Sequence, residues 1–559
     1  MNEKSEAVDS ASRQALRQLV DPQPERHDLV IGFVGAIGTA WDPVLRGFES
    51  SLRRFDYVAK TVHVAGLLDD LEYKPWDPLP GRDSRDYYER RMNAGDTFRA
   101  TTGIGASMAA LAVREVVKHR SQQAKGGKPV AYLLRSLKHP DEVKLLRQVY
   151  GEAFSLVGVA STAEERRKTL SESYSPLEDA LSLEAERLVA RDESDSGNRQ
   201  FGQNVRDTYF MADVFVSGGA GMDVSRDVDR YVDSVFGFPF LTPGPHEEGM
   251  WFAQGAALRS GAPARQVGVA LIPKIGTPVV AGTNEVPRPG GGQYWDGDRP
   301  DHRDFRGGQD PNPNYIKGVV QELLERLAKH DWLVDHKKDL PGPALVAQAR
   351  QPDDRGSSVL GGARASALIE FTRCLHAEQA AIINAARSGV STQDAILYST
   401  TFPCHECAKM IIGAGIVEVH YIEPYPKSLV DRLYRHLIDT SPPVRVERGL
   451  VRNKVPFYQF LGIAPRHYSR AFTAGERKTD DSLVAFKRNE ACPSTPGWSA
   501  TAMEQAESVA VASISRIVQE LATGRAGRIG SADGADADLE RQAEPTPTRE
   551  AEGKRRSRS

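Results

Sequence analysis

The 559-residue chain has few cysteines and no long apolar run. Its four cysteines are too few to build a disulfide framework, so we expect a reducing, cytoplasmic environment. No stretch approaches the ~18 continuous apolar residues of a membrane-spanning helix, and the polar first residues lack the apolar core of a secretory signal. We therefore expect a protein with no membrane association.

An excess of one charge is also missing. The 72 basic and 75 acidic side chains give a formal net charge of −3. A domain that holds long nucleic acid usually presents a basic surface, so this balance argues against a long nucleic acid as partner. At about 100–200 residues per domain, the length predicts two to four domains.

The hydrophobic pattern divides the chain into two α/β parts. After a polar lead over 1–27, short apolar runs alternate with helical patterns over 28–240, beginning with the strand-like run Leu29–Val34. This alternation predicts βαβ units and a parallel sheet with helices on both faces. A Pro- and Gly-rich stretch at 238–245 marks a boundary, and a second α/β domain is predicted over 246–475.

The remaining segments are less regular. Within the second domain we expect long inserts over 285–363, followed by a helix over Ala365–Ser388 and another over Cys404–Gly413. Helical spacing over 500–524 predicts a helix that docks on the body or pairs with a second copy, which would form a homo-oligomer. The segment 526–559 is rich in Ala, Asp, Gly and Pro and is predicted to be disordered.

One spacing pattern carries chemistry. His376 and Glu378 are followed by Cys404 and Cys407, which lie three residues apart at the start of a predicted helix. One histidine and two cysteines are three protein ligands, the number typical of catalytic Zn²⁺. Glu378 can then face a water without being a ligand and move its protons. A structural zinc site would need a fourth ligand and would leave Glu378 unexplained.

This His-x-Glu…Pro-Cys-x-x-Cys pattern is the signature of zinc nucleoside and nucleobase deaminases. The segments 376–385, 402–412 and 414–421 resemble deoxycytidylate (dCMP) deaminases. The resemblance implies a cytidine-deaminase-fold α/β/α domain that binds Zn²⁺. It also implies that Asn284 contacts the substrate sugar and that the backbone of Ala377 touches the base.

The chain is longer than a typical dCMP deaminase. Over 28–470 it resembles bacterial antiphage deoxycytidine-nucleotide deaminases, in which a P-loop kinase-like domain precedes the deaminase. That resemblance implies depletion of dCTP and dCMP during phage infection. It also implies a nucleotide-sensing or regulatory first domain, with room for a second nucleotide and for an inhibitory partner.

A glycine-rich loop follows the first predicted strand, where backbone amides can bind phosphate at a helix N-terminus. Its candidate nucleotide-binding residues are Gly32, Gly35, Gly38 and Thr39. The loop is not a Walker A sequence, because Thr39 stands where the phosphate-binding Lys belongs and Ala40 replaces the Mg²⁺-binding Ser/Thr. We expect no phosphoryl transfer. The charged segment 161–198 is typical of a solvated helical face; the alternative is a lid over a nucleotide.

The leading hypothesis is zinc-dependent hydrolytic deamination of free dCTP and/or dCMP to deoxyuridine nucleotides. One alternative is a deaminase that acts on cytosine or adenine in tRNA or single-stranded DNA, which would need a basic channel and stacking aromatics. A second alternative is a non-enzymatic nucleotide sensor with a vestigial deaminase site. Turnover of free deoxycytidine nucleotides separates the first hypothesis from both alternatives.

Overall fold

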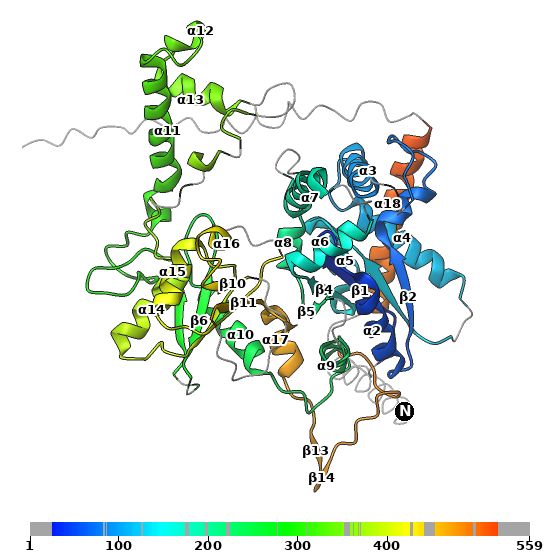
Figure 1. Cartoon of the computed structure of the whole chain (residues 1–559). Helices are drawn as coiled ribbons and strands as arrows, with labels where there is room; N and C mark the ends of the chain where they lie inside the picture. The colour runs from blue at the N-terminus through cyan, green and yellow to red at the C-terminus, as the bar shows by residue number, and fades with distance from the viewer. Residues whose placement is uncertain are drawn as a thin grey trace, which may run out of the picture.

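Over the residues that it describes, the computed structural model forms two six-stranded sheets and one two-stranded sheet, with helices on both faces of the larger sheets (Figure 1). The predicted α/β class is confirmed. The structure describes residues 25–523 except 82–83, 85, 124–126, 174–177, 196–199, 220–223, 275, 277, 309, 352–357, 362, 367, 369–370, 425–428, 441–452 and 496–498. The predicted lead over 1–27 lies almost entirely outside the described residues, and the tail over 526–559 lies entirely outside them.

The first sheet has the strand order β12-β5-β4-β1-β3-β2 and is parallel except at β12. Its strands are β1 (Leu29–Gly35), β2 (Val58–His63), β3 (Val130–Arg135), β4 (Phe154–Ala160), β5 (Val214–Ser217) and β12 (Gly462–Ile463). In β1, Ile31 pairs with Leu133 and Ser155. β1 and β4 are buried over their whole lengths, because central strands of a parallel sheet are covered on both faces.

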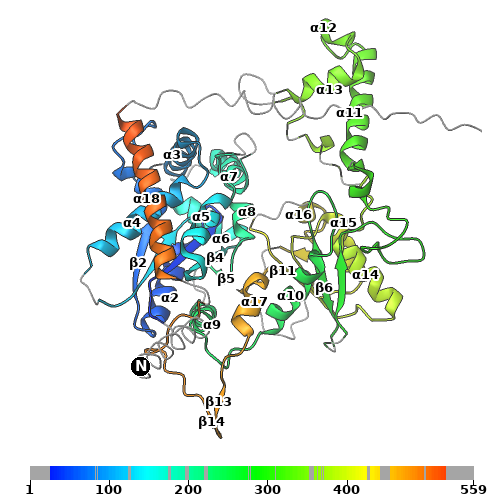
Figure 2. The ribbon, with the colours of Figure 1, turned by 180° about the vertical axis from the view of Figure 1, so that it is seen from behind.

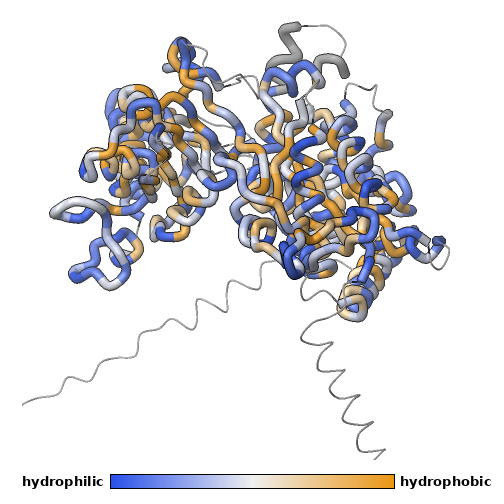
Figure 3. Tube along the Cα trace, turned by 90° about the horizontal axis from the view of Figure 1, so that it is seen from below, coloured by the Kyte–Doolittle hydropathy of each residue, from blue (hydrophilic) through white to orange (hydrophobic). Residues whose placement is uncertain are grey.

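Two groups of helices cover the first sheet. On one face, α2 (Trp41–Arg53) and α9 (Ser225–Val235) bury their apolar sides in a cluster that includes Phe48 and Tyr231. The other face packs against α4, α5 and α18. Figure 3 shows hydrophobic segments running through the interior and hydrophilic ones at the periphery. The helices not yet given bounds are η1 (Val64–Asp70), α3 (Tyr87–Thr102), α4 (Ser107–Ser121), α5 (Pro140–Tyr150), η2 (Gly151–Ala153), α6 (Ala163–Ser173), α7 (Glu178–Glu193) and α8 (Val205–Tyr209).

The second sheet has the strand order β10-β11-β9-β8-β6-β7. β6 runs antiparallel to β7 and β8, whereas β8, β9, β11 and β10 are parallel to one another. The strands are β6 (Gly268–Ile272), β7 (Val280–Thr283), β8 (Ile396–Ser399), β9 (Glu418–Tyr421), β10 (Ile438–Asp439) and β11 (Val455–Gln459).

Helices also cover both faces of the second sheet. α14 (Ala377–Ser388) and α15 (His405–Gly413) pack on one face, and α10 (Pro245–Ala257) packs on the other. β7 approaches α14 very closely: a Cβ added at Gly282 would lie 2.1 Å from the carbonyl oxygen of Ala377. Only glycine allows this contact, which fixes the end of β7 against the start of α14.

The predicted helix over Ala365–Ser388 begins too early. The structure has only a short turn, η4 (Arg364–Ser366), and α14 starts at Ala377. Leu375 instead forms an isolated bridge with Glu285, its N–H donating to the Glu285 carbonyl at 3.1 Å. This long-range pairing keeps the chain extended up to the residue that caps α14.

After β11 the chain returns to the first sheet. β12 adds to β5 with Ile463 opposite Val214, and α17 (Pro465–Phe472) contacts both α9 and α10. The chain then passes through β13 (Lys478–Thr479), β14 (Ser482–Leu483) and α18 (Ala500–Ala522), which lies beside α4 (Figure 2). The C-terminal described residues therefore pack against the N-terminal half.

The insert in the second half carries its own helices and projects from the second sheet (Figure 1). The remaining elements are η3 (Asp304–Gly307), α11 (Pro311–Lys329), α12 (Asp335–Lys338), α13 (Gly342–Arg350) and α16 (Val430–Leu433). Among the described residues, every helix is too short or too polar to span a bilayer.

Candidate active site

Three metal-ligating side chains converge at the N-termini of α14 and α15. His376 Nδ1 lies 3.3 Å from the Sγ atoms of both Cys404 and Cys407, and the three ligand atoms all lie within 4.8 Å of one another. Ligands of a tetrahedral zinc ion lie roughly 3.5 Å apart. The structure therefore brings together an imidazole and two sulfurs, a donor set and spacing that fit Zn²⁺.

Local helix chemistry positions these ligands. His376 immediately precedes α14, and its backbone N–H donates to Gln379 Oε1 at 3.0 Å. Cys404 immediately precedes α15, and its Sγ accepts the backbone N–H of Cys407 at 3.5 Å. Two of the three ligands thus cap a helix N-terminus, where the helix dipole favours negative charge.

The two thiols hold their protons unequally. Hydrogen bonding with Cys407 and His376 lowers the pKa of Cys404 to about 4, whereas the bond to Cys404 and burial raise the pKa of Cys407 well above its usual range. A bound Zn²⁺ would hold both sulfurs as thiolates.

Glu378 lies in the first turn of α14 beside this ligand set. Its side chain is buried, and its Oε2 accepts a hydrogen bond from Cys407 Sγ at 3.3 Å. Burial is the main cause that raises the pKa of Glu378, followed by the charge of Cys404. A carboxyl group shifted in this direction can accept and return a proton nearer neutral pH.

Asn284 follows β7 on the edge of the same site. Its backbone neighbour Glu285 pairs with Leu375, directly before His376. The Asn284 carboxamide accepts the N–H of Val267 and donates to the carbonyl of Arg265, both at 2.7 Å. These bonds fix the strand-end loop. They use one lone pair and one N–H of the carboxamide, and the sugar contact of Asn284 stays a prediction, as does the base contact of the buried Ala377.

Sequence reasoning missed two residues that shape this loop. Glu285 is 1% exposed and accepts the N–H of Gly261 at 2.8 Å. Gln293 is also buried and donates to the carbonyl oxygens of Thr283 and Glu285 at 2.6 and 3.2 Å. The signal available in the sequence was the predicted insert itself, which starts at Glu285 and folds back onto the strand end.

A second group of ligand-type residues lies on the α10 face of the sheet. The ligand atoms of His246, Glu418 and His420 lie within 4.8 Å of one another. His420 Nε2 already bonds Glu418 at 2.6 Å, and His246 Nδ1 lies 3.0 Å from the Tyr398 hydroxyl. These hydrogen bonds and the stacked rings account for the group as packing between α10 and the sheet.

The predicted nucleotide-binding glycines lie in the other half of the molecule. Gly32 is inside β1, where an added Cβ would meet Leu137, and Gly35 ends the same strand. Gly38 has φ +83°, and Thr39 Oγ1 donates to the Ala36 carbonyl at 2.7 Å. Gly38 and Thr39 line a cavity, whereas Gly32 does not.

The comparison with protein families concerns the second half. Residues 244–423 match the model of the cytidine and deoxycytidylate deaminase zinc-binding region. This segment contains Asn284, His376, Glu378 and both cysteines of the ligand set. Residues 244–423 are therefore similar to the zinc-binding region of cytidine and deoxycytidylate deaminases.

Individual proteins are similar over shorter stretches. The deoxycytidylate deaminase of Enterobacteria phage T4 is 35% identical over 108 residues, which are 18% of this chain and 53% of that protein. ComE operon protein 2 of Bacillus subtilis is 47% identical over 53 residues, which are 10% of this chain and 28% of that protein. The chain thus spans about half or less of the length of these relatives.

Among solved structures, the dCMP deaminase of cyanophage S-TIM5 in complex with dCMP and dUMP is 19% identical. It aligns with 32% of this chain and 82% of its own, with a TM-score of 0.17.

Proposed function

We propose that the second half of the chain hydrolyses the 4-amino group of a free deoxycytidine nucleotide, dCMP or dCTP, with zinc as cofactor. The observation that carries the proposal is the convergence of His376, Cys404 and Cys407 beside the buried Glu378. The match of 244–423 to a deaminase zinc-binding region and the similarity to deoxycytidylate deaminases support the substrate class.

Each of these residues has a separate role in the proposed reaction. His376, Cys404 and Cys407 would hold Zn²⁺, which when bound polarises a water molecule for attack. Glu378 takes a proton from that water and passes it to N3 of the cytosine ring while oxygen adds at C4. The same carboxylate then takes the second proton from the oxygen now bound at C4 and gives it to the amino group. The C4–N bond breaks as C4=O forms, so that water and the cytosine nucleotide yield ammonia and the uracil nucleotide.

The test is a substrate panel with matched variants. Purified full-length protein is incubated with dCMP, dCDP, dCTP and deoxycytidine, and products are separated by chromatography. We expect deoxyuridine product from dCMP or dCTP, and one bound zinc per chain by elemental analysis. The absence of a deoxyuridine product from all four compounds would refute the proposal.

The variant pair separates proton transfer from metal binding. Glu378→Gln keeps the shape of the side chain and should lose roughly 10²–10⁴-fold in kcat while it retains zinc. Cys404→Ser should lose both zinc and activity. Retained turnover in Glu378→Gln would show that Glu378 is not the proton carrier.

We also propose a role in antiphage defence by depletion of deoxycytidine nucleotides, which rests on the resemblance of residues 28–470 to bacterial antiphage deoxycytidine-nucleotide deaminases. Cells that express the intact chain should lose dCTP and dCMP after infection and release fewer phage than cells that express Glu378→Gln. Equal phage yields and equal nucleotide pools in the two strains would reject this role and leave the deaminase chemistry untouched.

A further inference from the structure

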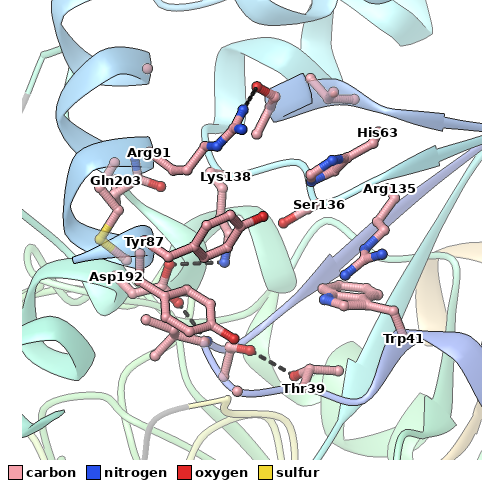
Figure 4. Close-up of a pocket in the computed structure, with 18 of the residues that line it drawn as sticks. Thr39, Trp41, His63, Tyr87, Arg91, Arg135, Ser136, Lys138, Asp192 and Gln203 are labelled. Carbon is pink, nitrogen blue, oxygen red and sulfur yellow. Dashed lines mark hydrogen bonds and ion pairs between the residues drawn. The ribbon is translucent and has the colours of Figure 1, made fainter. Parts of the chain in front are cut away.

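A cavity of about 340 Å³ lies at the carboxyl end of the first sheet, in the half that the deaminase chemistry does not use. Its walls come from the loop after β1, the ends of β2 and β3, and the start of α3 (Figure 4). Open α/β sheets bind their ligands at this end, and a volume of a few hundred Å³ suits a small molecule.

An internal carboxylate occupies the polar end of this cavity. Asp192, near the end of α7, accepts the backbone N–H of Ile37 at Oδ2 and the Lys138 ammonium at Oδ1, both at 2.8 Å. Its side chain is 0% exposed. Lys138 Nζ also donates to the carbonyl of Gly35 at 3.1 Å. The loop and Lys138 thus already hold one anion.

These donors are the kind that bind phosphate. A backbone N–H beside the N-terminus of α2 and a lysine ammonium are typical phosphate ligands. The loop lacks the Walker lysine, but Lys138 supplies an ammonium from the segment after β3. Gly38, at φ +83°, lets the loop turn, and an added Cβ there would meet the Arg166 carbonyl at 2.7 Å.

The other end of the cavity offers aromatic faces. Trp41 and Tyr87 line it, and Arg135 lies over the Trp41 ring at 5.8 Å. Figure 4 shows Trp41 and Arg135 on one side of the cavity and Tyr87 on the other, with the Lys138–Asp192 ion pair on the Tyr87 side. Flat rings and a guanidinium stack well on a heterocyclic base.

We propose that this cavity binds a nucleotide whose phosphate replaces the Asp192 carboxylate and whose base lies between Trp41 and Tyr87. Asp192 is then a stand-in anion that must leave before the ligand enters. Its departure moves the end of α7, so the ligand-free and ligand-bound states differ at that helix.

A chain of ion pairs connects this helix end to the second half. Glu193, next to Asp192, lies 3.8 Å from Arg206, and Arg206 lies 3.4 Å from Glu423 at the end of β9. Glu423 lies 3.7 Å from Arg265, whose carbonyl accepts the Asn284 carboxamide. Nucleotide binding therefore alters the substrate edge of the candidate deaminase site; this coupling, unlike the binding itself, rests on the proposed function.

Binding is tested by calorimetry on the full chain with ATP, dTTP, adenosine and inorganic tripolyphosphate. Neither nucleotide contains cytosine, so neither is consumed by the proposed reaction. We expect ATP or dTTP to bind at least tenfold more tightly than adenosine or tripolyphosphate. If tripolyphosphate bound as tightly as the nucleotides, the cavity would be an anion site only and the aromatic rings would have no role in binding. If neither nucleotide bound, the proposal would be wrong.

Variants test the stand-in directly. Asp192→Asn removes the competing charge and should tighten nucleotide binding about tenfold, whereas Lys138→Met should weaken it at least tenfold. Asp195→Asn, which alters a carboxylate on the same segment that pairs with Arg191 instead, is the control and should bind as the unmodified chain does. Weaker binding by Asp192→Asn would show that Asp192 supports the ligand rather than replaces it.

Hydrogen exchange on the unmodified chain avoids any folding defect of a variant. Nucleotide should slow exchange at amides 36–40 and speed it at 186–193. Protection confined to 376–407 would place the nucleotide in the deaminase site and refute the cavity assignment.

Coupling is measured as dCMP or dCTP turnover with and without saturating ATP or dTTP. We expect at least a twofold change that is absent in Arg206→Gln. Unchanged turnover with a bound nucleotide would refute the coupling alone. Nucleotide binding without any turnover of dCMP or dCTP would refute the proposed function and leave the cavity assignment intact.

Discussion

The two halves place their polar groups at equivalent points of their folds but build them differently. In the second half, the ligand set lies at the N-termini of α14 and α15 and comes from two short sequence motifs. In the first half, the Ile37 N–H and the Lys138 ammonium hold the Asp192 carboxylate beside the N-terminus of α2, and these three residues are far apart in sequence. The first arrangement can be recognised from spacing, and the second only from the folded chain.

Removal of the metal should give the largest difference between the two halves. Dialysis against a zinc chelator should abolish deamination, with a loss of at least about 100-fold, because the water would lose its activation. The same treated protein should still bind ATP or dTTP in the first half, where the proposed ligands are an amide and an ammonium. Activity is measured by product chromatography and binding by calorimetry, before and after zinc is returned.

Two results would contradict these assignments. If chelation removed nucleotide binding too, nucleotide binding would depend on the metal site of the second half. If the chelated, metal-free protein kept its full activity, the zinc assignment would be wrong.

The sequence predicted the second half better for a physical reason. His376 and Glu378 lie two residues apart, as parts of one helix start, and Cys404 and Cys407 lie on one helical turn, so local geometry alone brings each pair together. Bringing the histidine–glutamate pair and the cysteine pair together requires the folded second sheet, on which both helices pack. The start of α14 was misplaced because Leu375 pairs with Glu285, 90 residues earlier, and no local pattern reports such a contact.

The first half shows the opposite case. The charged run that contains Asp192 and Glu193 is typical of a solvated helical face, yet both side chains are buried. Their burial depends on Lys138 and Arg206, which contact them from other elements. The addition of β12 to the first sheet was equally invisible, since a two-residue strand carries no periodicity.

A buried ion pair beside the cavity gives the largest expected change in stability. Arg99 is 2% exposed and pairs with Asp96 at 2.8 Å and Glu142 at 3.1 Å. Arg99→Met leaves buried Glu142 without its cation and Asp96 with Arg191 alone, so it should lower the free energy of unfolding by about 3–5 kcal/mol. Urea denaturation of the full chain measures the change.

An exposed pair provides the matched control. Arg53→Met breaks the contact with Glu49 on the surface of α2, where both side chains are largely exposed. Such pairs contribute about 0.3–0.5 kcal/mol. Equal effects of the two substitutions would mean that burial does not strengthen the contribution of the Arg99 ion pairs.

The cavity loop should also be sensitive at Gly38. Gly38→Ala forces a side chain into a left-handed backbone and toward the Arg166 carbonyl, so we expect a loss of about 1–3 kcal/mol and weaker nucleotide binding. Gly318→Ala is the opposite case, because Gly318 lies exposed inside α11 with open space around it. That substitution should stabilise the chain by about 0.5–1 kcal/mol. Thermal unfolding distinguishes the signs, and stabilisation by both would remove the proposed constraint on the loop.

The pH dependence of stability tests the connection between the halves. Burial raises the pKa of Glu423 to about 7, against the lowering effect of Arg206 and Arg265 and with further help from Glu193 and Asp207. Between the ordinary glutamate pKa of 4.5 and about 7, the folded state keeps a proton that the unfolded state has lost. Stability should therefore fall as pH rises through this window, by about 1 kcal/mol per pH unit.

Glu423→Gln cannot titrate, so its free energy of unfolding should lose that part of the slope between pH 5 and 7. Glu322→Gln makes the same change at an exposed pair on α11 and should keep the slope of the unmodified chain. Because deprotonated Glu423 is the form that attracts Arg206, the effect of ATP or dTTP on turnover should also weaken as pH falls below about 7. Coupling that stayed constant across this range in the unmodified chain would show that the signal does not pass through the Glu423 charge.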